Sequence, residues 1–98
     1  MPEQITQTHI MQEFHSITLE DGTRKHNHVS LLQYSGEYTI FYVLTHRTQY
    51  SDNRADTLSD FLFRDGKEAM IRTVNLWNSV VMEKNYDPDA PTGDDFPF

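Results

Sequence analysis

The nine residues from Tyr38 to His46 are the most apolar stretch of this 98-residue chain, and they constrain its fold more than any other segment. Most of them are β-branched or aromatic, which favours a β-strand. Successive side chains of a strand point to opposite faces, so both faces of this strand are apolar. They carry Ile40, Tyr42 and Leu44 on one side and Phe41 and Val43 on the other. One helix can cover only one face, so we expect a partner subunit, and hence a homodimer, to cover the second.

Three other segments alternate in part between apolar and polar residues and are bounded by turn residues, which predicts strands. They are Ile10 to Leu19, Arg24 to Tyr34 and Leu58 to Arg64. Asp21-Gly22 is typical of a tight hairpin between the first two, and Ser35-Gly36 and the loop 49–56 separate the others. Alternation in the second strand predicts one face formed by His26, His28, Ser30, Leu32 and Tyr34.

A helix is predicted to begin after Asp65. Asp65 and Glu68 form a capping-box pattern, in which the aspartate accepts a hydrogen bond from a free backbone N–H and Glu68 reaches back to the cap. From there to about Met82, mostly apolar residues recur at helical spacing in two adjacent rows. One row is Met70, Val74, Trp77 and Val81, and the other is Ala69, Thr73, Leu76 and Val80. The opposite side of the helix is a polar stripe of Glu68, Arg72, Asn75 and Ser79. The predicted class is α+β, a four-stranded antiparallel sheet followed by one C-terminal amphipathic helix. This order argues against an OB-fold, whose barrel needs strands after its helix.

The acidic charge of the chain is concentrated near its C-terminal end. The net charge is −7, yet residues 1–86 carry 11 acidic and 8 basic side chains, while residues 87–98 carry four aspartates and no cation. Pro88, Pro91, Gly93 and Pro97 separate these aspartates and prevent a helix or a core. We therefore predict a flexible N-terminal arm at 1–9, a folded body at 10–86 and a disordered acidic tail at 87–98.

Composition and motifs argue against several classes of protein. The chain has no cysteine, which excludes disulfides and thiolate zinc sites. No apolar run is long enough to span a bilayer, and Met1-Pro-Glu-Gln lacks the layout of a signal peptide, so we expect a cytoplasmic protein without a membrane partner. No nucleophile, phosphate-binding loop or paired-carboxylate motif is readable, so we expect neither catalysis nor a cofactor. His26 and His28 share a strand face, but no third ligand follows at a recognisable spacing, so we predict no metal site.

The last six residues, Gly93-Asp94-Asp95-Phe96-Pro97-Phe98, resemble the C-terminal tip of bacterial and phage single-stranded DNA-binding proteins. That tip typically ends in several aspartates, an aliphatic residue, proline and phenylalanine. Here Gly93 replaces one aspartate and Phe96 replaces the aliphatic residue. In that family the tip recruits replication, recombination and repair proteins, so the resemblance implies this docking role for Asp94, Asp95, Phe96, Pro97 and Phe98.

The chemistry of the tip agrees with docking into another protein. Phe98 combines an aromatic ring with the α-carboxylate, which suits a pocket with apolar walls and a basic rim. Pro97 restricts the backbone and lowers the entropy lost on docking, while Asp94 and Asp95 are attracted to the basic rim. The alternative is an acidic tail that only keeps the protein soluble.

If the tail recruits enzymes to DNA, the body should hold the strand, which requires exposed aromatic side chains and cations. Residues 22–54 contain four cations, two anions and most of the tyrosines. The predicted nucleic-acid-binding residues are Arg24, Lys25, Tyr34, Tyr38, Tyr42, Arg47, Tyr50 and Arg54. The order of strands and helix is similar to that of Whirly-type and coactivator-type single-stranded DNA-binding domains, which pair as dimers and bind DNA across their strands. The tyrosines have a second interpretation, as core or dimer-interface residues.

We therefore expect a single-stranded DNA-binding protein that holds DNA and recruits replication, recombination and repair proteins through its tip. Its small size favours a phage origin, which would place it in the host cytoplasm. Two alternatives remain. The first is an interaction protein or inhibitor that binds no DNA and mimics the host tail, which suits the acidic body. The second is a small acidic inhibitor that mimics DNA charge, although the body has no phosphate-like run of anions.

Overall fold

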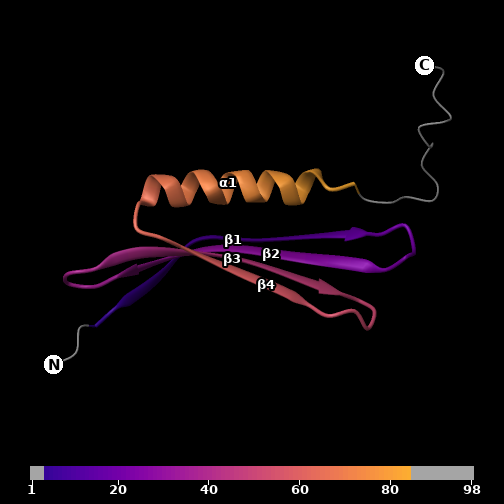
Figure 1. Ribbon diagram of the computed structural model, residues 1–98, viewed down its shortest axis with the longest axis horizontal. Coiled ribbons are helices and arrows are strands. Elements are labelled where there is room, and N and C mark those ends of the chain that lie inside the picture. The colour runs from indigo at the N-terminus through magenta and orange to yellow at the C-terminus, as the bar shows by residue number, and fades with distance from the viewer. Residues whose placement is uncertain (1–3, 85–98) are drawn as a thin grey trace, which may run out of the picture.

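The computed structural model describes residues 4–84, which form four strands and one helix (Figure 1). The elements are β1 Thr6–Thr18, β2 Arg24–Ser35, β3 Ile40–Tyr50, β4 Thr57–Phe63 and α1 Gly66–Met82. Neighbouring strands are antiparallel and the sheet order is β1-β2-β3-β4, so each strand pairs with the next in sequence. The predicted α+β class is confirmed. The predicted acidic tail and its docking tip lie outside the described residues.

The bounds of two strands differ from the sequence prediction by more than one residue. β1 begins at Thr6 rather than at Ile10, so residues 6–9, which we assigned to a loose arm, belong to the sheet. They pair with β2, from Thr6 opposite Ser35 to His9 opposite Leu32. Their polar sequence concealed the strand, because backbone pairing to a long neighbour needs no apolar pattern. β3 is shifted toward the C-terminal end, so it ends at Tyr50 and Tyr38 lies in the preceding turn.

Local sequence sets the first hairpin and the start of the helix as predicted. Gly22 has φ = +87°, a conformation that residues with a Cβ rarely adopt, and its N–H donates to the Leu19 carbonyl at 2.9 Å. The Asp21 carboxylate accepts a hydrogen bond from the Thr23 N–H at 2.9 Å. Asp65 is the N-cap of α1, and its Oδ2 accepts from the Glu68 N–H at 3.2 Å, which satisfies one free donor of the first turn.

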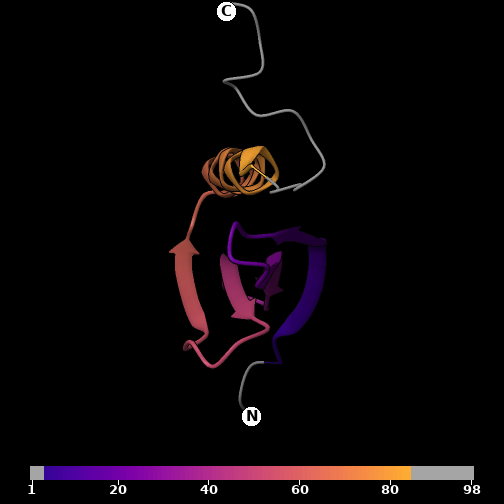
Figure 2. The same ribbon diagram turned by 90° about the vertical axis from the view of Figure 1, so that its right-hand side faces the viewer.

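α1 lies across one face of the sheet, which we call the covered face (Figures 1 and 2). It packs mainly on β2 and β3. The buried apolar cluster between the two layers consists of Val29, Leu31, Leu44, Phe63, Ala69 and Val80, with Met11, Tyr42, Leu76 and Trp77 partly buried around it. Thr73 is also buried there, and its hydroxyl is paired because it donates to the Ala69 carbonyl at 2.7 Å.

Only part of the apolar surface predicted for α1 is buried. Ala69, Thr73 and Val80 face the sheet, whereas Met70 and Val74 of the other predicted row are exposed. The reason is geometric: a helix on a sheet contacts it along a narrow strip, and side chains further around the helix point past the sheet surface. Within residues 4–84, no helix is long and apolar enough to cross a membrane.

The opposite face of the sheet, which we call the open face, has no described element over it (Figure 2). Both faces of β3 are apolar as predicted, since Tyr42 belongs to the covered cluster and Val43 pairs with Leu32 and Leu62 on the other side. The Cα radius of gyration is 18.0 Å, compared with about 12–13 Å for a globular domain of this length. The described molecule is an elongated two-layer structure with one apolar sheet face uncovered.

Candidate nucleic-acid interface

The strand register identifies the side chains of the open face, because residues paired across antiparallel strands point to the same side. From one end of the sheet to the other, the open-face rows are Ser16–His26–Gln49, Phe14–His28–Arg47–Leu58, Gln12–Ser30–Thr45–Asp60, His9–Leu32–Val43–Leu62 and Gln7–Tyr34–Phe41. The face predicted for the second strand is therefore correct, and the structure adds the neighbours that share it.

The first aromatic pair of the open face is formed by Phe14 of β1 and His28 of β2. Their rings are stacked, with centroids 4.3 Å apart and planes inclined by 6°. Phe14 is 67% exposed, so the ring surface away from His28 is accessible. Arg47 lies opposite His28 on β3 and is exposed. This row presents an aromatic surface and a guanidinium group side by side.

A second aromatic pair lies at the other end of the open face. Tyr34 of β2 stacks on Phe41 of β3, with centroids 4.9 Å apart and planes inclined by 5°. Gln7 Nε2 donates to the Tyr34 hydroxyl at 2.9 Å, which holds the phenol against β1. His28 and Tyr34 are six residues apart on one strand, which separates the two aromatic pairs by about 20 Å at 3.3 Å per residue.

The surface between the two pairs is partly apolar and partly polar. The Thr45 hydroxyl donates to the Asp60 carboxylate at 2.8 Å. The adjoining row is aliphatic and contains Leu32, Val43 and Leu62, the last of which is 61% exposed. The open face thus combines two aromatic platforms with a central aliphatic strip.

The open face is the less acidic side of the described molecule. Residues 4–84 contain ten acidic and eight basic side chains. Of these, the open face carries Arg24 and Arg47 against a single carboxylate, Asp60, while the other carboxylates belong to the loops, the helix or the covered face. Within the described part of the chain, neither of these two arginines forms an ion pair. Their guanidinium groups are therefore available to an anionic ligand.

The structure divides the eight predicted nucleic-acid-binding residues among three places. Arg24, Tyr34 and Arg47 lie on the open face, and Lys25, Tyr42 and Tyr50 lie on the covered face. Tyr38 and Arg54 lie in loops at opposite ends of β3. The sequence grouped these residues by proximity along the chain, but neighbours such as Arg24 and Lys25 alternate between faces.

The covered-face members of the prediction take part in packing. Lys25 Nζ binds both carboxylate oxygens of Glu83 at 2.9 and 2.8 Å, which ties the end of α1 to β2. Tyr42 packs beneath the start of the helix, where a Cβ on Gly66 would lie 2.8 Å from the tyrosine hydroxyl. Tyr42 thus follows the alternative interpretation of the tyrosines, as a core residue.

Arg54 is held by the loops at one end of the sheet. Its guanidinium binds Asp52 at 2.7 Å and Asp21 at 3.1 Å, and it lies 4.7 Å from the ring centroid of Tyr50. Hydrogen bonds from Thr23 lower the pKa of Asp21, and hydrogen bonds from Arg54 lower the pKa of Asp52. The bonds to Asp52 in turn raise the pKa of Arg54. The charge of Arg54 is therefore matched locally by two carboxylates.

Three of the four residues that form the stacked pairs of the open face were not among the predicted site residues: Phe14, His28 and Phe41. A sequence signal was present, because strand alternation had already placed His28 on the same face as Tyr34. What alternation does not reveal is which face the helix covers. That choice decides whether an aromatic residue lies in the core or at the surface.

A polar cluster lies on the covered face below the C-terminal half of α1. His46 Nε2 is 3.0 Å from Asn27 Oδ1, and the Thr48 hydroxyl donates to the same oxygen at 3.3 Å. Burial lowers the pKa of His46, and the nearby positive charge of Lys25 lowers it further, while Glu83 opposes this shift. The neutral imidazole is favoured, so this cluster contributes to folding rather than to an anion site.

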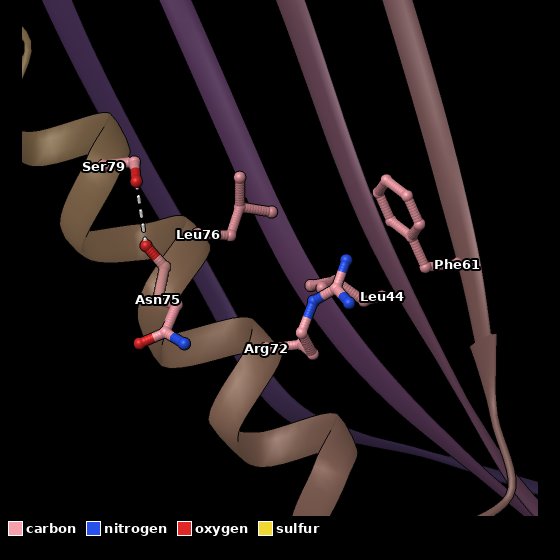
Figure 3. Close-up of a pocket in the computed structure, with 6 residues that line it drawn as sticks. All are labelled: Leu44, Phe61, Arg72, Asn75, Leu76 and Ser79. Atoms are coloured by element: carbon pink, nitrogen blue, oxygen red, sulfur yellow. Dashed lines mark hydrogen bonds between the residues drawn. The ribbon is translucent and has the colours of Figure 1, made fainter.

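A groove opens on the covered side between α1 and β4 (Figure 3). It has a volume of about 220 Å³ and is lined by Leu44, Phe61, Arg72, Asn75, Leu76 and Ser79. The Arg72 guanidinium lies 5.9 Å from the centroids of both Phe61 and Phe63. Pockets for small organic ligands usually measure about 300–1,000 Å³. This groove is smaller than that, and its cation is already placed over aromatic rings.

No described part of the chain offers a metal centre, since no group of three His, Asp or Glu side chains between residues 4 and 84 is placed to hold an ion. Comparison with known proteins gives no match to a protein-family model, to a curated protein or to a solved structure. The function must therefore be argued from the chemistry of the surfaces described above.

Proposed function

We propose that this protein binds single-stranded DNA across the open face of its sheet. One observation carries the proposal: two stacked aromatic pairs stand on an uncovered sheet face, in the same region as two unpaired arginines. Surfaces that bind single strands combine aromatic platforms for the bases with cations along the backbone path. The open face provides both kinds of group, and it is the side of the described chain with the fewest carboxylates.

In the proposed complex, aromatic side chains contact the bases and arginines contact the phosphates. A base would stack on the exposed surface of Phe14, and another on the Tyr34–Phe41 pair about 20 Å away. Arg47 and Arg24 would contact phosphates, because their guanidinium groups are not neutralised within the described chain. With few phosphate contacts, binding should depend moderately on salt and strongly on stacking.

The proposal also includes the acidic tip, Asp94 to Phe98, as the segment that recruits replication, recombination and repair proteins to the bound DNA. Its support is the resemblance of these residues to the tip of single-stranded DNA-binding proteins. The aspartates of the tail would compete with phosphates for the arginines of the open face. Removing residues 87–98 should therefore tighten DNA binding, most clearly at low salt.

Titration of fluorescently labelled oligo-dT with the full chain tests the binding surface. Phe14→Ala and Phe41→Ala should each weaken binding by about 5- to 150-fold, since base–aromatic stacking contributes about 1–3 kcal/mol per base. Phe61→Ala is the matched control, because this phenylalanine is partly exposed on the covered side and should leave affinity unchanged. If all three variants lost oligo-dT affinity equally, or if none of them lost affinity, the result would contradict a binding site on the open face.

A second function is favoured by the aliphatic part of the open face. Leu58 and Leu62 of β4 are 63% and 61% exposed, and exposed apolar patches often mark protein interfaces. The chain would then be an interaction protein that binds no DNA and uses its tip to mimic the tail of another single-stranded DNA-binding protein. Complete indifference to oligo-dT at low salt, with capture of a tail-binding enzyme retained, would support this function instead.

A further inference from the structure

The groove between α1 and β4 has apolar walls and a polar rim (Figure 3). The walls come from both layers and consist of Leu44, Phe61 and Leu76. The rim comes from the helix alone, and its side chains are exposed: Arg72, Asn75 and Ser79. Apolar walls with a basic rim are the two features expected of a pocket for a C-terminal aromatic residue.

The size of this groove suits one aromatic ring. Its volume of about 220 Å³ is too small for a drug-sized ligand. A cavity of about 150 Å³ that is lined by leucine, isoleucine and phenylalanine is nevertheless large enough to bind benzene. Phe61 is 40% exposed, so its ring is accessible to a ligand that enters the groove. The space therefore fits a single phenyl group.

Arg72 supplies a positive charge that the described residues do not neutralise. Its guanidinium lies 5.9 Å from the ring centroids of Phe61 and Phe63, close to the outer limit of about 6 Å for a cation–π contact. Between residues 4 and 84 it forms no ion pair, and Glu68, one turn earlier on α1, does not pair with it. Arginine binds carboxylates with strong, charge-assisted hydrogen bonds. The groove therefore fits a ligand that carries an aromatic ring beside a carboxylate.

The last residue of this chain has that chemistry. Phe98 carries a phenyl ring and the α-carboxylate on one residue, and Asp94 and Asp95 precede it. The two aspartates favour approach to a positive charge such as that of Arg72, because opposite charges steer an encounter.

The distance between the groove and the end of α1 also suits the tip. The helix residues that line the groove, 72–79, lie three to ten residues before Met82, where α1 ends. At 1.5 Å per residue this is about 4.5–15 Å along the helix. Fourteen residues, 85–98, follow the described part of the chain, and a flexible linker of that length has a root-mean-square span of about 20 Å. The tether is therefore long enough to return the tip to the groove.

We propose that the groove between α1 and β4 is a binding site for a C-terminal phenylalanine, and that its ligand is the tip of the same chain. The ring of Phe98 lies between Leu76 and Phe61, and the α-carboxylate binds the Arg72 guanidinium. The tether favours the chain's own tip over that of a second copy, because a short linker gives an effective concentration in the millimolar range.

The inference rests on the part of the proposed function that makes the tip a docking ligand, and it does not rest on DNA binding. A tip in the groove and a tail that competes for the arginines of the open face are alternative positions of one segment. A protein that is recruited by the tip must first displace it from the groove.

Binding of a labelled peptide to the full chain measures whether the groove is occupied. The probe has the sequence of residues 91–98 and a fluorophore at its N-terminus, so its C-terminal carboxylate is free. Phe98→Ala empties the groove and should bind the probe about tenfold more tightly than the wild type in fluorescence polarisation. A tip at an effective concentration of about 1 mM competes by this factor with a peptide whose dissociation constant is about 100 µM. Equal affinities of the two chains would overturn the proposal.

An amidated probe tests the contact between the carboxylate and Arg72. In the Phe98→Ala chain, the amidated peptide should bind about two- to fivefold more weakly than the free acid, as expected for an exposed ion pair. Adding Arg72→Gln should remove this difference, whereas adding Arg64→Gln should retain it, because Arg64 does not line the groove. Both arginines are exposed, so both variants should remain folded by circular dichroism. Equal binding of the free acid and the amide to the Phe98→Ala chain would overturn the proposed contact.

Amide chemical shifts of the ¹⁵N-labelled full chain locate the tip. Phe98→Ala should shift the amides of Phe61 and Leu76 and leave those of Phe14 and Phe41 on the open face unchanged, whereas a tip held on the open face would give the reverse. Adding unlabelled wild type to the labelled Phe98→Ala chain should not restore the shifts. Restoration would assign the tip to a second copy and overturn the proposal.

These measurements contain no DNA, so they separate this inference from the proposed function. Failure to bind oligo-dT would leave the occupied groove unaffected. Conversely, an empty groove would overturn only the inference, since recruitment by the tip is measured with a tail-binding enzyme.

Discussion

The two faces of this sheet are built from the same four strands but differ in what covers them. The covered face meets α1 and buries Val29 and Leu31 completely. The open face carries equally large side chains, such as Phe14 and Leu62, that remain mostly exposed. The comparison shows that hydrophobicity alone does not separate core from surface in a one-helix, four-strand protein. The face without a helix retains apolar and aromatic groups that are available for binding.

The largest expected difference between the faces is in stability. Leu31 and Leu32 are neighbours on β2, but Leu31 lies in the buried cluster and Leu32 on the open face. Leu31→Ala should lower the free energy of unfolding by about 2–5 kcal/mol, because it removes buried methyl groups and leaves a cavity. Leu32→Ala should cost about 1 kcal/mol, as expected for a half-buried side chain. Urea unfolding followed by circular dichroism measures both.

If Leu31→Ala and Leu32→Ala lowered the free energy of unfolding equally, the two faces would not differ in how deeply they bury their side chains. That outcome would mean that the open face is covered in solution, and DNA binding there would lose its surface.

A smaller effect distinguishes the cations of the two faces. Lys25→Gln should lower the free energy of unfolding by up to about 1 kcal/mol, since it breaks the partly exposed ion pair with Glu83, and should not alter the salt dependence of oligo-dT binding. Arg47→Gln should keep stability within about 0.5 kcal/mol and reduce the slope of log affinity against log salt by about 0.7, the value for one phosphate contact on a single strand. If Lys25→Gln reduced the salt dependence of oligo-dT binding and Arg47→Gln did not, the nucleic acid would lie on the covered face.

The smallest expected effect is a pH dependence that arises from the covered face. Burial lowers the pKa of His46 in the folded protein from its ordinary value of 6.5. The unfolded chain therefore binds a proton more readily, and stability falls as the pH drops below about 6.5 until the folded histidine also titrates. His46→Gln should flatten the pH dependence of the unfolding midpoint between pH 7.5 and 5. An unchanged slope would contradict a lowered pKa for His46 in the folded protein.

Much of the fold follows from local patterns in the sequence. The Asp21-Gly22 turn, the Asp65 cap and the alternation of β2 each depend on a few neighbouring residues, and all three are found as predicted. The start of β1 was predicted wrongly, because residues 6–9 become a strand only through pairing with the end of β2. Such pairing is a long-range interaction, which no local pattern can reveal.

The candidate site likewise depends partly on local sequence patterns and partly on long-range contacts. The sequence by itself determined the strands, the helix and which residues share a strand face, because side-chain alternation is a property of the backbone. Only the tertiary structure decided that α1 covers the face of Lys25 and Tyr42 and leaves the face of Arg24, Tyr34 and Arg47 open. Both faces of β3 are apolar, so either could have received the helix from local pattern alone. The packing of α1 against Val29, Leu31 and Leu44 selects one face, and the other becomes the candidate binding surface.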